Sequence, residues 1–280
     1  MVPGENRRPD GLSDQGSISK RGPVLIMEHQ DSITAARSIV SKSRRITFLT
    51  GAGISTDSGI PDFRGPSGLW TKDPGAEKLS DIRYYLESRQ IRVKAWLNRL
   101  QQFEQARVPN AGHLAIAGFE ATGQLHALVT QNVDGLHQRA GSNPALLIEV
   151  HGTILDVRCL GCNHVSPMPE TLERVRQGED DPNCRRCGGI LKSDTISFGQ
   201  SLRLETIGRA MDAASSCDCL IAIGTSLQVY PITGMIPVAV EANARLIIIN
   251  NQSTAMDEWA DLLVQAPISE VLPKILQVDI

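Results

Sequence analysis

The sequence lacks a long apolar segment, a large net charge and the start of a secretion signal. Its longest apolar runs have only the length of a β-strand, which is too short for a helix that crosses a bilayer. Its net charge is -3 over 280 residues, so no overall basic field points to nucleic acid or to an anionic membrane surface. We therefore expect no membrane partner and no direct nucleic-acid partner.

The first 22 residues contain no apolar stretch of the kind that a signal peptide carries. They are rich in Gly, Ser, Pro, Asp and Arg, so we predict that residues 1–22 form a disordered tail. Without a secretion signal, the six cysteines are expected in a reducing, cytoplasmic compartment. Thiols there stay free to bind metal rather than pairing as disulfides.

Strand-like and helix-like segments alternate along the rest of the chain. Two apolar runs, LIAI and LIII, contain no alternating polar residues, as expected for parallel strands that are covered on both faces. The pattern predicts an α/β protein with a Rossmann-like, open and mostly parallel sheet. The predicted strands are 46–49, 125–130, 145–150, 219–223 and 246–249, and the predicted helices are one capped by Ser32, 112–121, 202–214 and 236–243.

Two segments interrupt this alternation. Residues of about 70–107 contain helix-like pieces and no strand, which predicts a helical flap after the first glycine-rich loop. Residues 157–191 carry four cysteines and too few apolar residues to make a core of their own, which predicts a small inserted metal-binding module. Residues 23–156 and 192–280 are predicted to form the Rossmann-like domain.

The four cysteines of the insert form two Cys-x-x-Cys pairs with 21 residues between them. Two such pairs can place four thiolates tetrahedrally around one zinc ion. Because four thiolates leave no position for water or substrate, the ion is expected to be structural. The predicted ligands are Cys159, Cys162, Cys184 and Cys187, whereas Cys217 and Cys219 are interpreted as small buried hydrophobic residues of a strand.

The stretch ITFLTGAGISTDSGIPDFRG, residues 46–65, begins like a nucleotide-binding loop. Gly51 and Gly53 allow a tight turn and a close approach of the backbone to a phosphate. The dinucleotide fingerprint G-x-G-x-x-G is broken, however, because its third glycine position is Thr56. Further glycines and a proline delay the helix that a dehydrogenase places here. The pattern therefore indicates a longer loop with other chemistry.

Polar residues follow three of the predicted strands at the point where each strand ends. TQNVDGLH (130–137) follows one strand, His151 in IEVHGT follows the next, and IGTS (223–226) ends a third. Open α/β sheets bind ligands at the carboxyl ends of their strands. With the glycine loop, four strand ends are thus expected to meet at one crevice, which favours a functional His151 over a structural one.

Together these motifs resemble those of the sirtuins, the NAD-dependent protein deacylases. The matching segments are GAGIST with GIPDFRG, TQNVDGLHQRAG, the HG pair at His151, the paired cysteines, GTSLQVYP and IIIN, in the family's order over residues 46–250. The resemblance implies NAD as a co-substrate, one structural zinc ion, and acyl-lysine proteins or peptides as substrates. The implied products are nicotinamide, deacylated lysine and O-acyl-ADP-ribose.

The resemblance also implies roles for individual residues. His151 would be the general base that accepts a proton from a ribose hydroxyl. Asp134 would hold the nicotinamide carboxamide, and Asn132 would bond the ribose and a nearby water. The implied NAD-binding residues are Gly51, Ala52, Gly53, Ser55, Asp62, Phe63, Arg64, Gln131, Asn132, Asp134, Gly224, Thr225, Ser226 and Asn250. The acyl-lysine would lie against Phe63, Ile196, Phe198, Gly199 and Val229.

One segment departs from the family pattern KPDxVxFGE, because residues 192–200 read KSDTISFGQ. These changes touch the peptide groove and therefore bear on substrate preference. Sirtuins that prefer succinyl- or malonyl-lysine carry a Tyr-x-x-Arg pair in the flap, whereas neither Tyr84 nor Tyr85 has an arginine three residues later. We predict a neutral acyl group, with acetyl first.

Two other functions stay open at this point. A mono-ADP-ribosyltransferase of the same fold would pass the ribose to another nucleophile, and a zinc-ribbon binding module would only sense NAD. His151 favours deacylation over transfer. The full set of pocket residues argues against a sensor, which needs no base.

Overall fold

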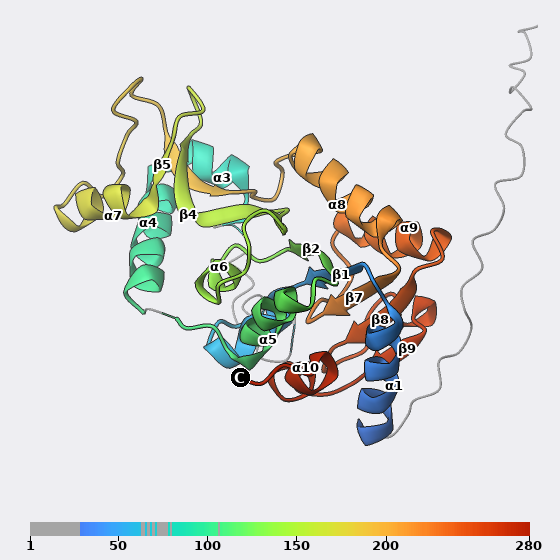
Figure 1. Ribbon diagram of the computed structural model, residues 1–280. Coiled ribbons are helices and arrows are strands. Elements are labelled where there is room, and N and C mark those ends of the chain that lie inside the picture. Colours follow the sequence, from blue (N-terminus) through green and yellow to red (C-terminus); the bar gives the residue numbers. More distant parts are fainter. Residues whose placement is uncertain are drawn as a thin grey trace, which may run out of the picture.

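A computed structural model describes residues 29–62, 65, 68, 71, 78, 80–105 and 107–280 (Figure 1). The predictions for the tail at 1–22, for Phe63 and for Arg64 therefore lie outside the described residues. Within the described part, no helix is both long and apolar enough to cross a membrane.

The larger of two sheets has six strands in the order β3-β2-β1-β7-β8-β9. Every neighbouring pair in it is parallel. In this sheet β2 and β3 lie on one side of β1, and β7, β8 and β9 lie on the other. The direction in which strands are added therefore reverses between β1 and β7. The carboxyl ends of the strands at such a switch point are where open α/β sheets bind ligands. The strands are β1 (Ile46–Thr50), β2 (Leu125–Thr130), β3 (Leu147–Glu149), β7 (Cys219–Ile223), β8 (Arg245–Ile249) and β9 (Leu262–Val264).

Helices cover both faces of this sheet, which explains why its central strands β1 and β7 are buried at every position (Figure 1). Phe48 of β1 packs in the core with α1, α5 and α10, and its ring meets Phe119 edge-on at 5.8 Å. The next residue, Leu49, faces the opposite core with α8 and α9. The covering helices are α1 (His29–Lys42), α5 (Ala111–Phe119), α8 (Leu204–Ser216), α9 (Met235–Glu241) and α10 (Ile268–Leu276).

The predicted α/β class and parallel sheet are confirmed, with differences in detail. The predicted strand 145–150 shortens to β3. Ser32 does not cap α1, because it lies in the first helical turn and its hydroxyl donates to the carbonyl oxygen of His29 at 2.8 Å. β9 and α10 were not predicted. The short helical turns are α6 (Leu136–Arg139), η1 (Ala52–Ser58), η3 (Glu120–Thr122), η4 (Ile232–Gly234) and η5 (Asp257–Trp259).

The second sheet has the antiparallel order β5-β4-β6 and extends beyond the predicted insert of residues 157–191, since β4 begins at Gly152 and β6 ends at Thr195. The flap helices lie beside it (Figure 1). Trp96 of α4 is buried in one cluster with Val157, Met168 and Leu172 of the insert. The prediction that the insert has no core of its own therefore needs refinement, since it shares one with the flap. The elements are α3 (Ile82–Glu87), α4 (Arg89–Glu104), β4 (Gly152–Cys159), β5 (Val165–Pro167), α7 (Met168–Arg176) and β6 (Leu191–Thr195).

Candidate active site and zinc centre

The glycine loop after β1 packs backbone against backbone on the loop after β7. The amide of Gly53 donates to the carbonyl oxygen of Gly224 at 2.8 Å. A Cβ on Gly53 would lie 2.8 Å from the Cα of Gly224, and one on Gly51 would lie 2.7 Å from the Cβ of Thr225. These glycines are thus required by the contact between two strand ends, in addition to any approach of a phosphate.

The residues after Gly51 differ from the sequence prediction of a delayed helix. A seven-residue 3₁₀ helix, η1, begins directly at Ala52. It ends at Gly59, whose φ of 78° is a left-handed conformation that favours glycine. The break in the dinucleotide fingerprint therefore reflects a short 3₁₀ helix in place of the long α-helix of a dehydrogenase. Beyond it, the carboxylate of Asp62 accepts from the amide of Gly65 at 3.0 Å.

His151 follows β3 and is held in one tautomer. Its Nδ1 lies 2.8 Å from the carbonyl oxygen of Gln131. Because a carbonyl can only accept, Nδ1 carries the proton and Nε2 is the basic nitrogen. Burial lowers the pKa of His151 from its usual value, and the bond to Gln131 opposes that effect. The imidazole is therefore neutral near pH 7, as a general base must be.

Gln131 connects this histidine to the far side of the sheet. Its side-chain amide donates to the hydroxyl of Thr225 at 2.9 Å, and its backbone amide donates to the carbonyl of Thr50. Gln131, which follows β2, thus contacts the last residue of β1 and residues that follow β3 and β7. The ends of these four strands therefore meet at one edge of the sheet, where the sequence predicted a crevice.

A second set of hydrogen bonds joins the predicted nicotinamide-binding residues. The side-chain amide of Asn132 donates to the carbonyl of Gly51 at 3.0 Å and to the Ser55 hydroxyl at 3.2 Å. The Ser55 hydroxyl donates to Asp134 at 2.8 Å. The other carboxylate oxygen of Asp134 accepts from the amide of Leu136 at 2.9 Å, at the start of α6. The hydroxyl proton of Ser55 is thus directed at Asp134, and a bond to a phosphate would require it to turn.

Two buried histidines, His113 and His137, contact the hydroxyl groups of Ser55 and Thr50. The sequence analysis gave neither of them a role in catalysis or NAD binding. His113 Nδ1 accepts from the amide of Asn110 in the capping box of α5, so its Nε2 carries the proton that faces the Ser55 hydroxyl at 3.4 Å. His137 bonds the Thr50 hydroxyl at 3.0 Å, and the two rings meet edge-on at 4.9 Å. The N-x-x-H spacing before α5 is the signal that could have pointed to His113.

Burial controls the charge of both rings. It lowers the pKa of His113 to about 4 and the pKa of His137 to about 3. The nearby Asp134 carboxylate opposes the shift at His113, whereas His113 itself adds to the shift at His137. Both imidazoles are therefore neutral hydrogen-bonding groups at physiological pH.

The predicted acyl-lysine rim connects the base to the flap. The amide of Ile196 donates to the carbonyl oxygen of His151 at 2.7 Å. Phe198 pairs with the strand-like start of the flap, since its amide donates to Ser80 at 2.8 Å and its carbonyl accepts from Ile82 at 3.0 Å. Its neighbour Gly199 is exposed. The rim is thus built from the segment after β6 and the flap together.

The remaining predicted residues lie on the far side of the crevice. Ser226 and Val229 follow β7 and are half-buried. Asn250 follows β8, and its side-chain amide donates to the carbonyl of Gln252 at 2.8 Å in a turn. The structure therefore brings these residues to the same edge of the sheet as Gly224 and Thr225.

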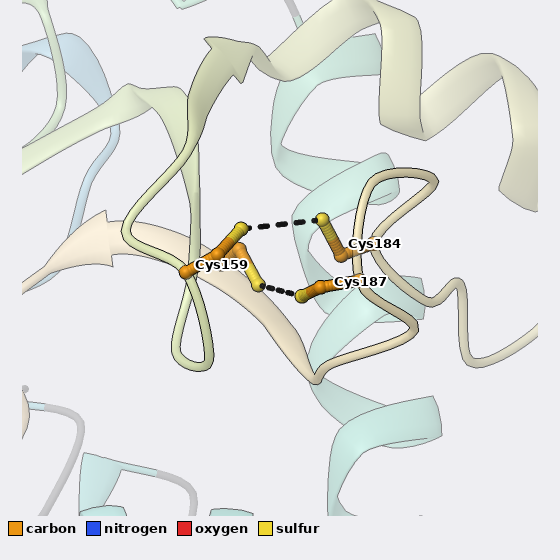
Figure 2. A group of neighbouring side chains, drawn as sticks. Cys159, Cys184 and Cys187 are labelled. Carbon is orange, nitrogen blue, oxygen red and sulfur yellow. Dashed lines mark hydrogen bonds between the residues drawn. The ribbon is translucent and has the colours of Figure 1, made fainter.

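The four cysteines of the insert form one cluster whose geometry fits zinc. Their sulfur atoms all lie within 4.8 Å of one another. The distances are 3.5 Å from Cys159 to Cys187 and 3.8 Å from Cys162 to Cys184 (Figure 2). A tetrahedron with Zn–S bonds of about 2.3 Å has edges of about 3.8 Å. Four thiolates at this spacing fit a closed, structural zinc site, as predicted.

Fold and site together define an α/β protein that combines glycine-lined loops at a switch point, a neutral histidine and a four-cysteine cluster that fits zinc. The chain belongs to the Sir2 family, whose model matches residues 51–231. It is 46% identical to NAD-dependent protein deacetylase 2 of Streptomyces coelicolor, over 83% of this chain and 96% of that protein. It is 39% identical to NAD-dependent protein deacylase 2 of Pyrobaculum aerophilum, over 85% of this chain and 92% of that protein.

Solved structures of Sir2 enzymes share the fold. One from work on the mechanism and regulation of Sir2 enzymes aligns with a TM-score of 0.80 at 37% identity, over 89% of this chain and 97% of that chain. A Sir2 enzyme bound to a propionylated peptide aligns with a TM-score of 0.75 at 27% identity, over 90% of this chain and 98% of that chain.

Proposed function

We propose that this chain is an NAD-dependent protein-lysine deacylase. It would convert NAD and an acyl-lysine protein or peptide to nicotinamide, deacylated lysine and O-acyl-ADP-ribose. The observation that carries the proposal is the 2.8 Å contact from His151 Nδ1 to the carbonyl of Gln131. This contact leaves Nε2 of a neutral imidazole as a base at the edge of the sheet where open α/β folds bind ligands.

The chemistry follows from that base. The bond from the ribose to nicotinamide breaks while the acyl oxygen of the substrate attacks the anomeric carbon. The transition state resembles an oxocarbenium ion, as in glycoside cleavage. His151 Nε2 accepts the proton of a ribose hydroxyl, and this oxygen then attacks the acyl carbon. Transfer of the acyl group to the ribose, with addition of water, releases the lysine.

The other residues of the site act by positioning. Asn132 and Asp134 hold the nicotinamide end, and their hydrogen bonds to Ser55 and Gly51 support that role because they fix both side chains before NAD binds. The residues proposed to bind the rest of NAD are Ala52, Gly53, Asp62, Phe63, Arg64, Gln131, Gly224, Thr225, Ser226 and Asn250. The residues proposed to hold the acyl-lysine are Phe63, Ile196, Phe198, Gly199 and Val229.

We further propose a neutral acyl group and a cytoplasmic location. Tyr85 of the flap is buried and its hydroxyl donates to the carbonyl of Leu191 at 2.7 Å, so it is already engaged and turned away from an acyl carboxylate. A cytoplasmic location is supported by the zinc ligands, which must stay reduced to bind the ion.

One assay separates the proposal from its two alternatives. Acetyl-lysine peptide and NAD labelled in the adenosine half are incubated with the protein, and nicotinamide, peptide mass and labelled products are followed. Nicotinamide and deacetylated peptide formed in equal amounts, with the label in O-acetyl-ADP-ribose, support a deacylase. Label on protein without deacetylation supports a transferase, and NAD binding without any product supports a sensor.

A further inference from the structure

A cavity of about 340 Å³ adjoins the predicted acyl-lysine rim. Its wall is made by β4, by β6 and by the segment that connects β6 to α8, which crosses from the small sheet to the large one (Figure 1). We call it the arginine pocket, because Arg158 and Arg203 both line it and both bond to Asp194. Its described lining residues include no zinc ligand and no residue proposed to bind NAD, although Arg158, Leu160 and Asn163 are chain neighbours of the ligands Cys159 and Cys162.

The arginine pocket has more positive than negative charge. Among the described residues that line it, Arg158, Arg203 and Lys192 are basic and Asp194 is the one acid. Asp194 is 8% exposed and accepts two bonds from Arg158, at 2.6 Å and 3.0 Å, and one from Arg203. A single carboxylate therefore serves two guanidinium groups, and the cavity retains a positive potential.

The buried side chain of Lys192 is the third basic group of the pocket. Its Nζ is directed at backbone oxygens, with bonds of 2.5 Å to Thr195 and 3.2 Å to Ser193. Burial is the main cause that lowers the pKa of Lys192 to about 7; the charges of Arg99 and Arg203 lower it further, and the carboxylate of Asp194 opposes them. A second anion in the cavity would relieve this repulsion.

Arg203 is the group that can receive such an anion. The described contacts of Arg158 involve three of its nitrogens, which donate to Asp194 and to the carbonyl of Asn163. Arg203 donates to Asp194 from Nη2 only, within the part of the chain that the structure describes, and its side chain is 42% exposed. A guanidinium offers five donors in a planar fork that matches carboxylate and phosphate oxygens.

The position of the cavity indicates where the anion comes from. Ile196 lines the arginine pocket and also belongs to the predicted rim, and its amide bonds the carbonyl of His151. Gln200 lines the pocket from the same segment. A peptide bound with its acyl-lysine at His151 would therefore place a neighbouring side chain next to the arginine pocket. This segment is also the one whose sequence departs from the family pattern.

We propose that the arginine pocket is an anion subsite for the protein substrate. In this proposal, which rests on the proposed deacylase function, Arg203 binds the carboxylate or phosphate of a side chain that flanks the acyl-lysine. Asp194 holds the guanidinium of Arg203 in place, and Arg158 adds positive charge behind it. The pocket would thus select acetylation sites in acidic or phosphorylated surroundings.

The test compares kcat/KM for acetyl-lysine peptides that differ at one flanking position at a time. Each position carries alanine, glutamate, phosphoserine or lysine. The wild-type protein is expected to prefer glutamate or phosphoserine over alanine by about tenfold at one position. Comparing the glutamate and phosphoserine peptides identifies which anion the pocket takes.

Two variants connect the preference to the pocket. Arg203→Ala is expected to reduce the ratio of acidic to alanine peptide to about one, and Arg203→Glu is expected to prefer the lysine peptide. The matched control is Arg209→Ala, which removes an exposed arginine of α8, the helix that follows Arg203. Arg209 lies outside the pocket lining, so this variant should keep the wild-type ratio. Because each ratio is taken on one preparation, it does not depend on the fraction that is folded.

Equal rates for all peptides with the wild-type protein would overturn the subsite while leaving the deacylase proposal intact. A preference for acidic peptides that survives Arg203→Ala as fully as Arg209→Ala would also overturn it. If no acetyl-lysine peptide is turned over, the proposed function and the subsite fall together.

Discussion

The amide of Gly53 donates to the carbonyl oxygen of Gly224 at 2.8 Å, so the loops after β1 and β7 meet without intervening side chains. Gly224 has a φ of 61°, and a Cβ on it would lie 2.4 Å from the backbone nitrogen of Ile54. Backbone cannot move aside as a flexible side chain can. The contact therefore fixes both the identity of these residues and the shape of the crevice.

From this contact we predict that Gly224→Ala destabilises the fold and weakens NAD binding. The left-handed φ alone costs about 1–2 kcal/mol for a residue with a Cβ, and the clash with Ile54 adds to it. Gly208→Ala is the matched control, because Gly208 lies inside α8 with nothing within 4 Å of its added Cβ. It should gain about 1 kcal/mol of stability. Chemical denaturation and NAD titration measure both variants, and a Gly224→Ala protein as stable as wild type would refute the account of the contact.

The zinc centre gives a second prediction. Purified protein should contain one zinc ion per chain, and Cys162→Ser should lose it, because three thiolates no longer close the site. Zinc loss should also change the fluorescence of Trp96, since this ring packs in the core of the module. Cys217→Ser changes a buried cysteine at the end of α8, outside the four-cysteine cluster, and should keep the zinc. The sequence interpretation of Cys217 as a strand residue was therefore wrong, whereas Cys219 is the first residue of β7. Elemental analysis decides, and a Cys162→Ser protein with full zinc content would contradict the assignment.

Two buried histidines predict a loss of stability in acid. The folded-state pKa values of His113 and His137, about 4 and about 3, lie below the usual value of 6.5. The unfolded chain therefore binds protons first, and the free energy of unfolding falls as the pH drops below 6.5. Each histidine contributes at most about 1.4 kcal/mol per pH unit until its folded pKa is reached.

The histidine contribution can be isolated by substitution. His137→Gln should make the free energy of unfolding less dependent on pH between 6.5 and 4, relative to wild type. His29→Ala replaces an exposed histidine and should leave that dependence unchanged. Denaturant melts across this range give the slopes, and identical slopes for His137→Gln and wild type would show that His137 is not buried in its neutral form.

The acyl group forms a fourth prediction. Tyr85 is bonded to Leu191, and neither flap tyrosine has an arginine at the spacing of succinyl-selective sirtuins. A succinyl carboxylate would therefore enter the apolar rim without the arginine partner of that motif, and leaving a charge unpaired costs several kcal/mol. We expect kcat/KM for succinyl-lysine peptide to be at least about tenfold below that for the acetyl-lysine peptide. Equal values for the two peptides would contradict this.

Much of the architecture followed from the sequence because it depends on local patterns. β1, β2, β7 and β8 are mostly apolar and buried at nearly every position, as burial on both faces of a parallel sheet favours. β9 has only three residues, which is too short for a clear pattern, and α10 contains Pro273, which argues against a helix although its buried residues follow the helical period. Their stability comes from packing on distant segments, which a local pattern does not encode.

The features of the site likewise divide into those that the sequence predicted and those that it did not. The cysteine spacing and the motif at His151 were readable because the chemistry constrains both residue type and spacing. The shared core at Trp96 and the bond from Ser55 to Asp134 were not readable, because each joins residues that are far apart in the chain. His113 lies at the start of α5, where its Asn-x-x-His spacing indicates only a capping role. Only the structure brings it to Ser55.

The central claim is that His151 is the base of an NAD-consuming deacylation. The most direct measurement is the rate of nicotinamide release and of peptide deacetylation in one reaction, for His151→Ala beside His29→Ala. We expect both rates to fall together by about a hundredfold or more in His151→Ala, as for loss of a general base. Both should equal those of wild type in His29→Ala. Unchanged deacetylation in His151→Ala, or deacetylation without nicotinamide release in the wild-type protein, would contradict the claim.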